Sequence, residues 1–231
     1  MLGSGLSRLE NFRRTKIFDL LAASPLILWY ALGLRKQAPI TLIRLRELIN
    51  GTIDLLDFLQ FIALIGSFVL TFVLVYLLII RRTPELKSYG ALPRAVAIAG
   101  TFMGNGFLYL KVVELSLPLQ ALTDILIIVG TIGSLVAVSR LGASFSVMPE
   151  ARKLVTRGPY AVIRHPLYLA EMIGVLGMVL QFQQPWATFL GAALFGFQYW
   201  RTVFEERVLM QAYPDYMTYR ARTWRFLPYL F

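Results

Sequence analysis

The sequence contains no cysteine and only one histidine, His165, among its 231 residues. The absence of cysteine excludes disulfide bonds, thiolate nucleophiles and cysteine-ligated metal centres. A single histidine also excludes a multi-histidine metal centre, whereas an ion held by carboxylates stays open. No metal site is predicted.

Charged residues are also scarce, at 16% of the chain, whereas 57% of the residues are hydrophobic and the mean hydropathy is +0.63. A soluble domain is about a quarter charged. The apolar residues gather in runs that approach the roughly 20 residues needed to cross a bilayer. The sequence therefore predicts an integral membrane protein with several spans. No small-residue cleavage site follows the first apolar run, so we expect no cleavable signal peptide.

The charge balance is strongly basic, with a formal net charge of +10. With the N-terminus inside, eighteen Lys and Arg residues fall in inner segments and five in outer ones (Arg35, Lys36, Arg44, Arg46 and Lys111). This asymmetry predicts cytoplasmic N- and C-termini, in a bacterial inner membrane or an endoplasmic-reticulum-like membrane. The basic residues flank apolar runs, so we expect contact with anionic membrane lipids and no nucleic-acid partner.

The apolar runs predict an all-α integral membrane protein with about six membrane segments. These are Ile17 to Leu34, Phe58 to Ile80, about Leu92 to Leu110, Leu119 to Ser139, Leu167 to Phe182 and Trp186 to Trp200. Residues 35–57 carry leucine and isoleucine three and four apart, which favours an amphipathic helix on the membrane surface, broken near Asn50-Gly51. The last two segments predict a helical hairpin, and Arg201 to Phe231 a cytoplasmic C-terminal cap.

The first group of candidate functional residues lies between Leu154 and Glu171. His165 stands there between Arg164 and Pro166. Because Pro166 suits the first turn of a helix, we expect His165 at or just before a helix N-terminus. Such an end favours a carboxylate or a phosphate.

A second polar cluster, Arg201 with Glu205 and Glu206, ends the last apolar segment. Arg201 and Glu205 are four residues apart, so a surface ion pair is one interpretation. Adjacent carboxylates at the end of a membrane helix are costly, however, and favour a functional role. They could accept hydrogen bonds from a ribose or an ammonium group.

Taken together, these motifs resemble the isoprenylcysteine carboxyl methyltransferase and phospholipid methyltransferase superfamily. The resemblance covers about the last 90 residues of the chain, and the first 120 match only as generic spans. It rests on several spaced elements: Leu141 to Ser146, Leu154-Val155-Thr156, Gly158-Pro159-Tyr160, Arg164-His165-Pro166, Tyr168, Glu205-Glu206, Tyr216, Tyr219, Arg222 and Pro228.

The resemblance implies a membrane methyltransferase that uses S-adenosyl-L-methionine, with a cytoplasmic cofactor pocket and a tunnel open to lipid. Residues 1–140 would then supply spans and an interfacial helix, and residues 141–231 the cofactor-binding catalytic region. The cofactor-binding residues implied are Leu154, Val155, Tyr160, His165, Pro166, Tyr168, Glu205 and Glu206, and the catalytic ones Arg201 and Glu206. The implied acceptor is a lipid or amphiphilic small molecule, and no obligate protein partner is inferred.

Two departures from the family pattern leave alternatives open. Ala170 stands where a glycine is usual and is followed by an unusual Glu171. Thr202 stands where prenylcysteine enzymes place an arginine, with Arg201 one position away. A prenylcysteine acceptor is therefore in doubt. Glu171 also matches a glutamate of membrane sterol and steroid reductases, although Leu167 replaces their asparagine. An NADPH-dependent reductase and a non-enzymatic membrane protein stay open as alternatives.

Overall fold

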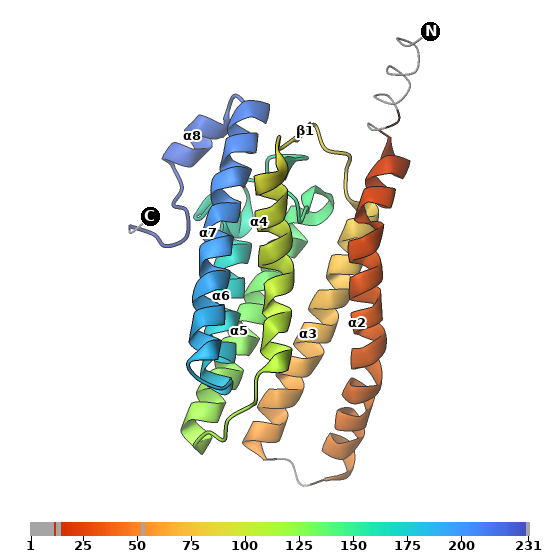
Figure 1. Cartoon of the computed structure of the whole chain (residues 1–231), viewed down its shortest axis with the longest axis vertical. Coiled ribbons are helices and arrows are strands. Elements are labelled where there is room, and N and C mark those ends of the chain that lie inside the picture. Colours follow the sequence, from red (N-terminus) through yellow and green to blue (C-terminus); the bar gives the residue numbers. More distant parts are fainter. Residues whose placement is uncertain (1–11, 13–14, 52–53, 230–231) are drawn as a thin grey trace.

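The computed structural model describes residue 12 and residues 15–51 and 54–229 (Figure 1). Residues 1–11 and 13–14, within the predicted N-terminal region, lie outside the described residues. The elements are α2 (Lys16–Asn50), α3 (Leu55–Ile80), β1 (Leu86–Lys87), α4 (Ala91–Phe102), α5 (Leu117–Leu141), β2 (Glu150–Ala151), α6 (Pro166–Gln181), α7 (Trp186–Ala212) and α8 (Tyr216–Ala221). Short 3₁₀ segments cover Met103–Tyr109, Gly142–Ser144 and Gly158–Ala161.

The helices α2 to α7 run roughly along the long axis of the molecule (Figure 1). Helix α3 packs against both α2 and α5, α5 packs along α6, and α7 contacts α4 and α6. The two short strands pair antiparallel, with Leu86 opposite Ala151 and Lys87 opposite Glu150. They lie at the end of the bundle where α8 also lies (Figure 1).

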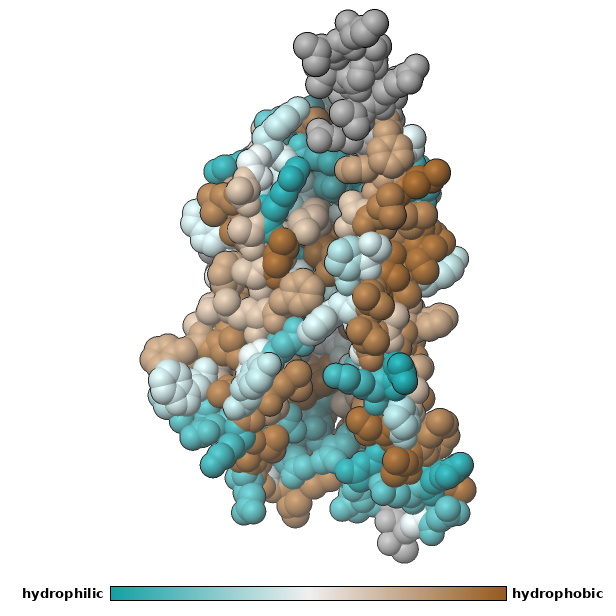
Figure 2. Space-filling view, turned by 45° about the vertical axis from the view of Figure 1, so that its right-hand side comes forward, coloured by the Kyte–Doolittle hydropathy of each residue, from teal (hydrophilic) through white to brown (hydrophobic). Residues whose placement is uncertain are grey.

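Much of the middle of the molecular surface is apolar, and polar side chains gather toward the ends of the face in Figure 2. Within the described part of the chain, three helices are long and apolar enough to cross a membrane: α2, α3 and α5 with its extension to Ser144. Large hydrophobic side chains on these helices are exposed, for example Leu21, Phe72 and Ile132. Surfaces of this kind suit contact with lipid chains. The protein therefore has the predicted all-α membrane fold.

The first predicted span was too short, and the separate surface helix was wrong. Helix α2 runs without a break over 35 residues from Lys16 to Asn50, with Pro25 and Pro39 inside it. At 1.5 Å per residue it is about 52 Å long, well beyond a hydrocarbon core of roughly 30 Å. The amphipathic stretch continues the spanning helix, and the predicted break near Gly51 is where α2 ends.

The later segments match the prediction more closely. Helix α3 begins three residues before its predicted span and ends with it at Ile80, and α5 extends its predicted span by two residues at each end. The third segment is an α-helix only to Phe102 and then becomes a 3₁₀ helix. Helices α6 and α7 form the expected hairpin, but α7 continues to Ala212 and carries the second polar cluster. The count of six membrane segments stays a prediction.

Helices α5 and α6 approach each other very closely at Gly130. A Cβ atom at Gly130 would lie 2.5 Å from the backbone nitrogen of Gly174 and 2.7 Å from the carbonyl oxygen of Ala170. Only a residue without a side chain allows this approach, as is common where membrane helices meet. The contact fixes the middle of α6 against α5.

A buried ion-pair network joins the N-terminal helices to the strand region. Asp19 receives hydrogen bonds from Arg81 (2.8 Å) and Arg152 (2.9 Å). Arg152 also donates to Glu150. Asp19, Arg81 and Arg152 are all at least 95% buried. The network therefore ties α2 and the end of α3 to β2.

The helix approach yields a first prediction. Gly130→Ala should destabilise the protein by about 1–3 kcal/mol, because the new methyl group overpacks a backbone contact. Gly196→Ala on α7 is the matched control, since a Cβ there meets no atom within 4 Å. Thermal unfolding of the detergent-solubilised variants measures both. Equal midpoints for the two variants would contradict this packing.

Candidate active site

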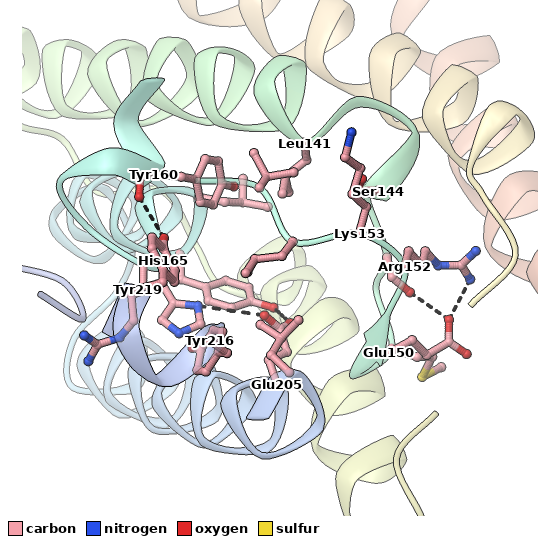
Figure 3. Close-up of a pocket in the computed structure, with 18 residues that line it drawn as sticks. Leu141, Ser144, Glu150, Arg152, Lys153, Tyr160, His165, Glu205, Tyr216 and Tyr219 are labelled. Carbon is pink, nitrogen blue, oxygen red and sulfur yellow. Dashed lines mark hydrogen bonds and ion pairs between the residues drawn. The ribbon is translucent and has the colours of Figure 1, made fainter. Parts of the chain in front are cut away.

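A polar cavity lies near the end of the bundle formed by α8 and the strands (Figure 3). The cavity measures about 100 Å³, and the empty space that includes open solvent at its mouth is about 760 Å³. The lining residues come from the α5–α6 connection, the start of α6, the end of α7 and α8: Leu141, Ser144, Ser146, Met148, Glu150, Arg152, Lys153, Leu154, Val155, Tyr160, Arg164, His165, Leu167, Tyr168, Glu205, Leu209, Tyr216 and Tyr219.

The backbone before α6 is held by the C-terminal tail. Arg164 N donates to the Trp224 carbonyl (2.7 Å), His165 N donates to the Arg225 carbonyl (3.2 Å), and Trp224 N donates to the Val162 carbonyl (3.2 Å). This pairing lies directly before Pro166, the first residue of α6. The expectation that His165 precedes a helix N-terminus is confirmed.

The His165 side chain is 95% buried and lies between two carboxylates. Its Nε2 atom is 3.2 Å from Glu206 Oε1, and its Nδ1 atom is 3.8 Å from Glu205 Oε2. The imidazole stacks on the ring of Tyr168, with ring centroids 5.7 Å apart. Two carboxylates and one stacked ring therefore set the orientation of the imidazole.

Glu206 is the most heavily paired carboxylate of the site and is 98% buried. Arg164 Nε and Arg225 Nη2 each donate to it at 2.9 Å, and Arg220 Nε lies 3.8 Å away. This number of cationic partners keeps the carboxylate ionised. Glu206 does not line the cavity, because its oxygens face Arg164, His165 and the tail.

Of the two adjacent glutamates, Glu205 is the one that lines the cavity. The hydroxyl of Tyr168 donates a hydrogen bond to Glu205 Oε1. In Figure 3, Glu205 and Tyr216 lie on one side of the cavity and Tyr160 on the other. Adjacent residues of a helix point about 100° apart, so Glu205 and Glu206 face different nitrogens of His165 and otherwise have different neighbours.

The wall opposite Glu205 depends on a tight turn and on a tyrosine of α8. Gly158 has a φ of +65°, and a side chain there would also approach Arg140. The Tyr219 hydroxyl donates to the Tyr160 carbonyl (2.7 Å), and burial raises the pKa of Tyr219 to about 12. The hydroxyl therefore stays a donor at physiological pH and holds the turn against α8.

Six of the residues that the resemblance implied line this cavity, namely Leu154, Val155, Tyr160, His165, Tyr168 and Glu205. Pro166 lies behind them as the first residue of α6, and Glu206 supports the wall. Arg201 lies elsewhere: it is 93% buried and lines a second cavity inside the bundle. The surface ion pair with Glu205 does not form, because Arg201 bonds Gln198 (3.0 Å) and the Val147 carbonyl (3.3 Å) instead.

Sequence reasoning missed two buried polar atoms of cavity-lining residues that have no hydrogen-bond partner. Tyr216 Oη and Arg152 Nε are buried without a hydrogen bond, and both residues line the cavity. Tyr216 belongs to the recognised tyrosine motif, so its place in the motif could have suggested a role. Arg152 carries no comparable signal in the sequence.

No group of three or more His, Asp or Glu side chains that could hold a metal ion occurs among the described residues. The chemical character of the cavity is that of a site for a polar organic ligand. It combines two carboxylates (Glu150 and Glu205), cationic side chains, tyrosine faces and an apolar strip.

Comparison with known proteins gives two relatives named for metal resistance. The cobalt-zinc-cadmium resistance protein CzcN of Cupriavidus metallidurans is 33% identical over 111 residues, which are 47% of this chain and 51% of that protein. The nickel-cobalt-cadmium resistance protein NccN of Alcaligenes xylosoxydans xylosoxydans is 30% identical over 108 residues, 46% of this chain and 51% of that protein. The match thus spans about half the length of these curated relatives.

A family model for phospholipid methyltransferases matches residues 119–216. The match begins in α5 and includes the α5–α6 connection, α6, α7 and the start of α8. It contains every residue that lines the cavity except Tyr219. Over residues 119–216, which are 98 of its 231 residues, the chain is therefore similar to the phospholipid methyltransferase family.

Proposed function

We propose that the protein is an S-adenosyl-L-methionine-dependent methyltransferase that acts on a lipid or other amphiphile arriving from the bilayer. The observation that carries the proposal is the polar cavity, which lies within the phospholipid methyltransferase region and beside the apolar helices. In this proposal the cavity lies on the cytoplasmic side, as the distribution of basic residues predicts.

The residues of the cavity fit such a cofactor. A sulfonium cation is stabilised by a carboxylate and by tyrosine faces, which Glu205 and Tyr160 offer. The amino-acid carboxylate would suit Arg152, whose Nε has no partner. An adenine ring would suit the apolar strip of Leu154 and Val155. A nucleoside-sized ligand is larger than the cavity and would extend into its open mouth.

When bound, the cofactor supplies an electrophilic methyl group. The protein's own residues then have to bind, orient and exclude water, which is where most of the rate gain of such a transfer arises. Glu206 and the tail hold His165, and His165 and Tyr168 set the carboxylate of Glu205. The described contacts therefore support positioning rather than covalent catalysis.

Any contribution to metal resistance, the trait in the names of the two relatives, would in this proposal act through a methylated membrane component. The substrates and partners of the whole protein are part of the same proposal, because the relatives match only over about half their length. We propose no obligate protein partner and no nucleic-acid partner.

Calorimetry with the purified, detergent-solubilised protein tests the proposed function directly. S-adenosylhomocysteine should bind with a micromolar dissociation constant, whereas NADPH should not bind. Binding of NADPH alone would move the protein to the membrane reductases. Binding of neither ligand would mean that the protein resembles the family in sequence but lacks the proposed cofactor binding.

Tyr216→Phe should have opposite effects on stability and on binding. Removing a buried hydroxyl without a partner should leave the thermal midpoint unchanged or raise it. The same change should weaken S-adenosylhomocysteine binding about 5–10-fold if the hydroxyl bonds the ligand, the worth of ~1–1.5 kcal/mol. Tyr109→Phe is the matched control, since Tyr109 is 88% exposed. Unchanged affinity in Tyr216→Phe would remove this residue from the binding site.

Substitutions of the two neighbouring glutamates should have different effects in the same two assays, thermal unfolding and S-adenosylhomocysteine binding. Glu206→Gln should destabilise the fold by about 3–5 kcal/mol, because it leaves Arg164 and Arg225 buried beside a neutral group. Glu205→Gln should keep the thermal midpoint but weaken S-adenosylhomocysteine binding at least tenfold, about 1.4 kcal/mol. The reverse pattern would show that Glu206, rather than Glu205, faces the ligand.

A further inference from the structure

A second cavity lies inside the bundle, between α2, α3, α4, α5, α6 and α7, and measures about 320 Å³. Its size is at the lower end of small-molecule sites, which are about 300–1,000 Å³. Most of the lining is apolar or small, including Leu70, Leu74, Val175, Met178 and Leu194. Such a lining suits an alkyl chain.

A row of polar side chains interrupts this apolar lining on one side. Gln198 Nε2 donates a hydrogen bond to Glu171 Oε2, and Arg201 Nη1 donates to Gln198 Oε1 at 3.0 Å. All three residues line the cavity. Charged side chains at this depth are expensive and usually mark a functional site.

The row is incomplete as a purely structural network. Arg201 is 93% buried, yet its Nε atom has no hydrogen-bond partner. Its Nη2 atom makes only a 3.3 Å contact with the Val147 carbonyl. No ion pair joins Arg201 to Glu171 directly in the described structure, so a polar ligand could engage both.

The second cavity adjoins the first across one layer of side chains. Leu167 borders both cavities. Tyr168 lines the first, and the Arg201 guanidinium lies over its ring at 4.7 Å from the centroid. A head group beside Arg201 would therefore lie on the other side of Tyr168 and Leu167 from a ligand in the first cavity.

We infer that the second cavity binds the methyl acceptor and that Glu171 is a catalytic residue, which accepts the proton of an acceptor whose head group carries an N–H or O–H. This inference rests on the proposed function and specifies the acceptor that it leaves open.

The charges of the row favour a proton-bearing head group over a carboxylate. Glu171 would repel a second carboxylate in a low-dielectric site, and like charges placed this close are strongly unfavourable. An amine or a hydroxyl can donate to Glu171 and accept from Arg201 Nε. Gln198 bridges the two ends and holds them apart.

In the proposed step, the lone pair of the acceptor nitrogen or oxygen would form a bond to the methyl carbon. The carbon–sulfur bond would break, with its electron pair going to sulfur. The proton of the acceptor passes to the Glu171 carboxylate. Water later removes it, so the net products are methylated acceptor, thioether and one proton.

The test uses the full chain in phosphatidylcholine bilayer discs with three chain-matched probes: dodecylamine, dodecanol and dodecanoate. Transfer of a labelled methyl group to the amine or the alcohol should exceed transfer to dodecanoate at least tenfold, about 1.4 kcal/mol. Glu171→Gln, which can keep the bond with Gln198, should lower that turnover by about 10²–10⁴-fold, the worth of a general base. Glu171→Asp should restore part of the loss.

Two controls separate this inference from folding and from the proposed function. Glu114→Gln makes the same substitution at an exposed site and should leave turnover unchanged. S-adenosylhomocysteine should bind Glu171→Gln within about twofold of the parent protein. If the parent protein itself fails to bind it, the proposed function fails; if binding is normal and Glu171→Gln turns over normally, only this inference fails.

A binding measurement decides the case in which no probe is methylated. With S-adenosylhomocysteine present, the parent protein should bind dodecylamine or dodecanol more tightly than dodecanoate, and Glu171→Gln should lose the preference. Preferred binding or methylation of dodecanoate would overturn the inference, as would equal affinity of the parent protein and the variant for all three probes.

Discussion

The site depends on a single buried carboxylate. Glu206 gathers Arg164 and His165 from the start of α6 and Arg225 from the tail, at distances of 2.9–3.2 Å. Removing several charged groups from water is repaid only when every one of them is paired. This requirement joins three segments that are far apart in the sequence, and it gives the imidazole one orientation. The cavity wall follows from that orientation.

A second constraint comes from the membrane. Backbone and side-chain polar groups within a bilayer must be satisfied by the protein itself, so a polar row among apolar helices has to be built from mutually bonded residues. Gln198 meets this requirement, because its amide donates to Glu171 and accepts from Arg201. The unpaired Nε of Arg201 is the exception, and Arg201 is one of the residues that line the inner cavity. The two cavities thus have different characters, one polar and near the end of the bundle, the other mostly apolar and inside it.

The sequence predicted most of the helices and the position of His165 just before α6. Both depend on local signals, namely the apolar runs and the proline that follows His165. It failed where distant contacts decide. Residues 35–50 have a pattern that suits either a surface helix or the end of a long spanning helix. The structure shows the long helix, and α2 packs against α3. The spacing of Arg201 and Glu205 suggested an ion pair, but Gln198 and the ring of Tyr168 draw the guanidinium toward the inner cavity. Nor can spacing alone tell which of two adjacent glutamates faces a ligand.

The ion pairs of Asp19 show that the region matched by the family model does not contain all the charges that its own arginine Arg152 is paired with. The family region begins at residue 119, yet Arg152, which lines the polar cavity, is neutralised by Asp19 in the first turn of α2. A fragment restricted to the family region would expose an arginine with half of its counter-charges missing. The N-terminal helices are therefore part of the cavity's electrostatic framework as well as its anchor in the lipid.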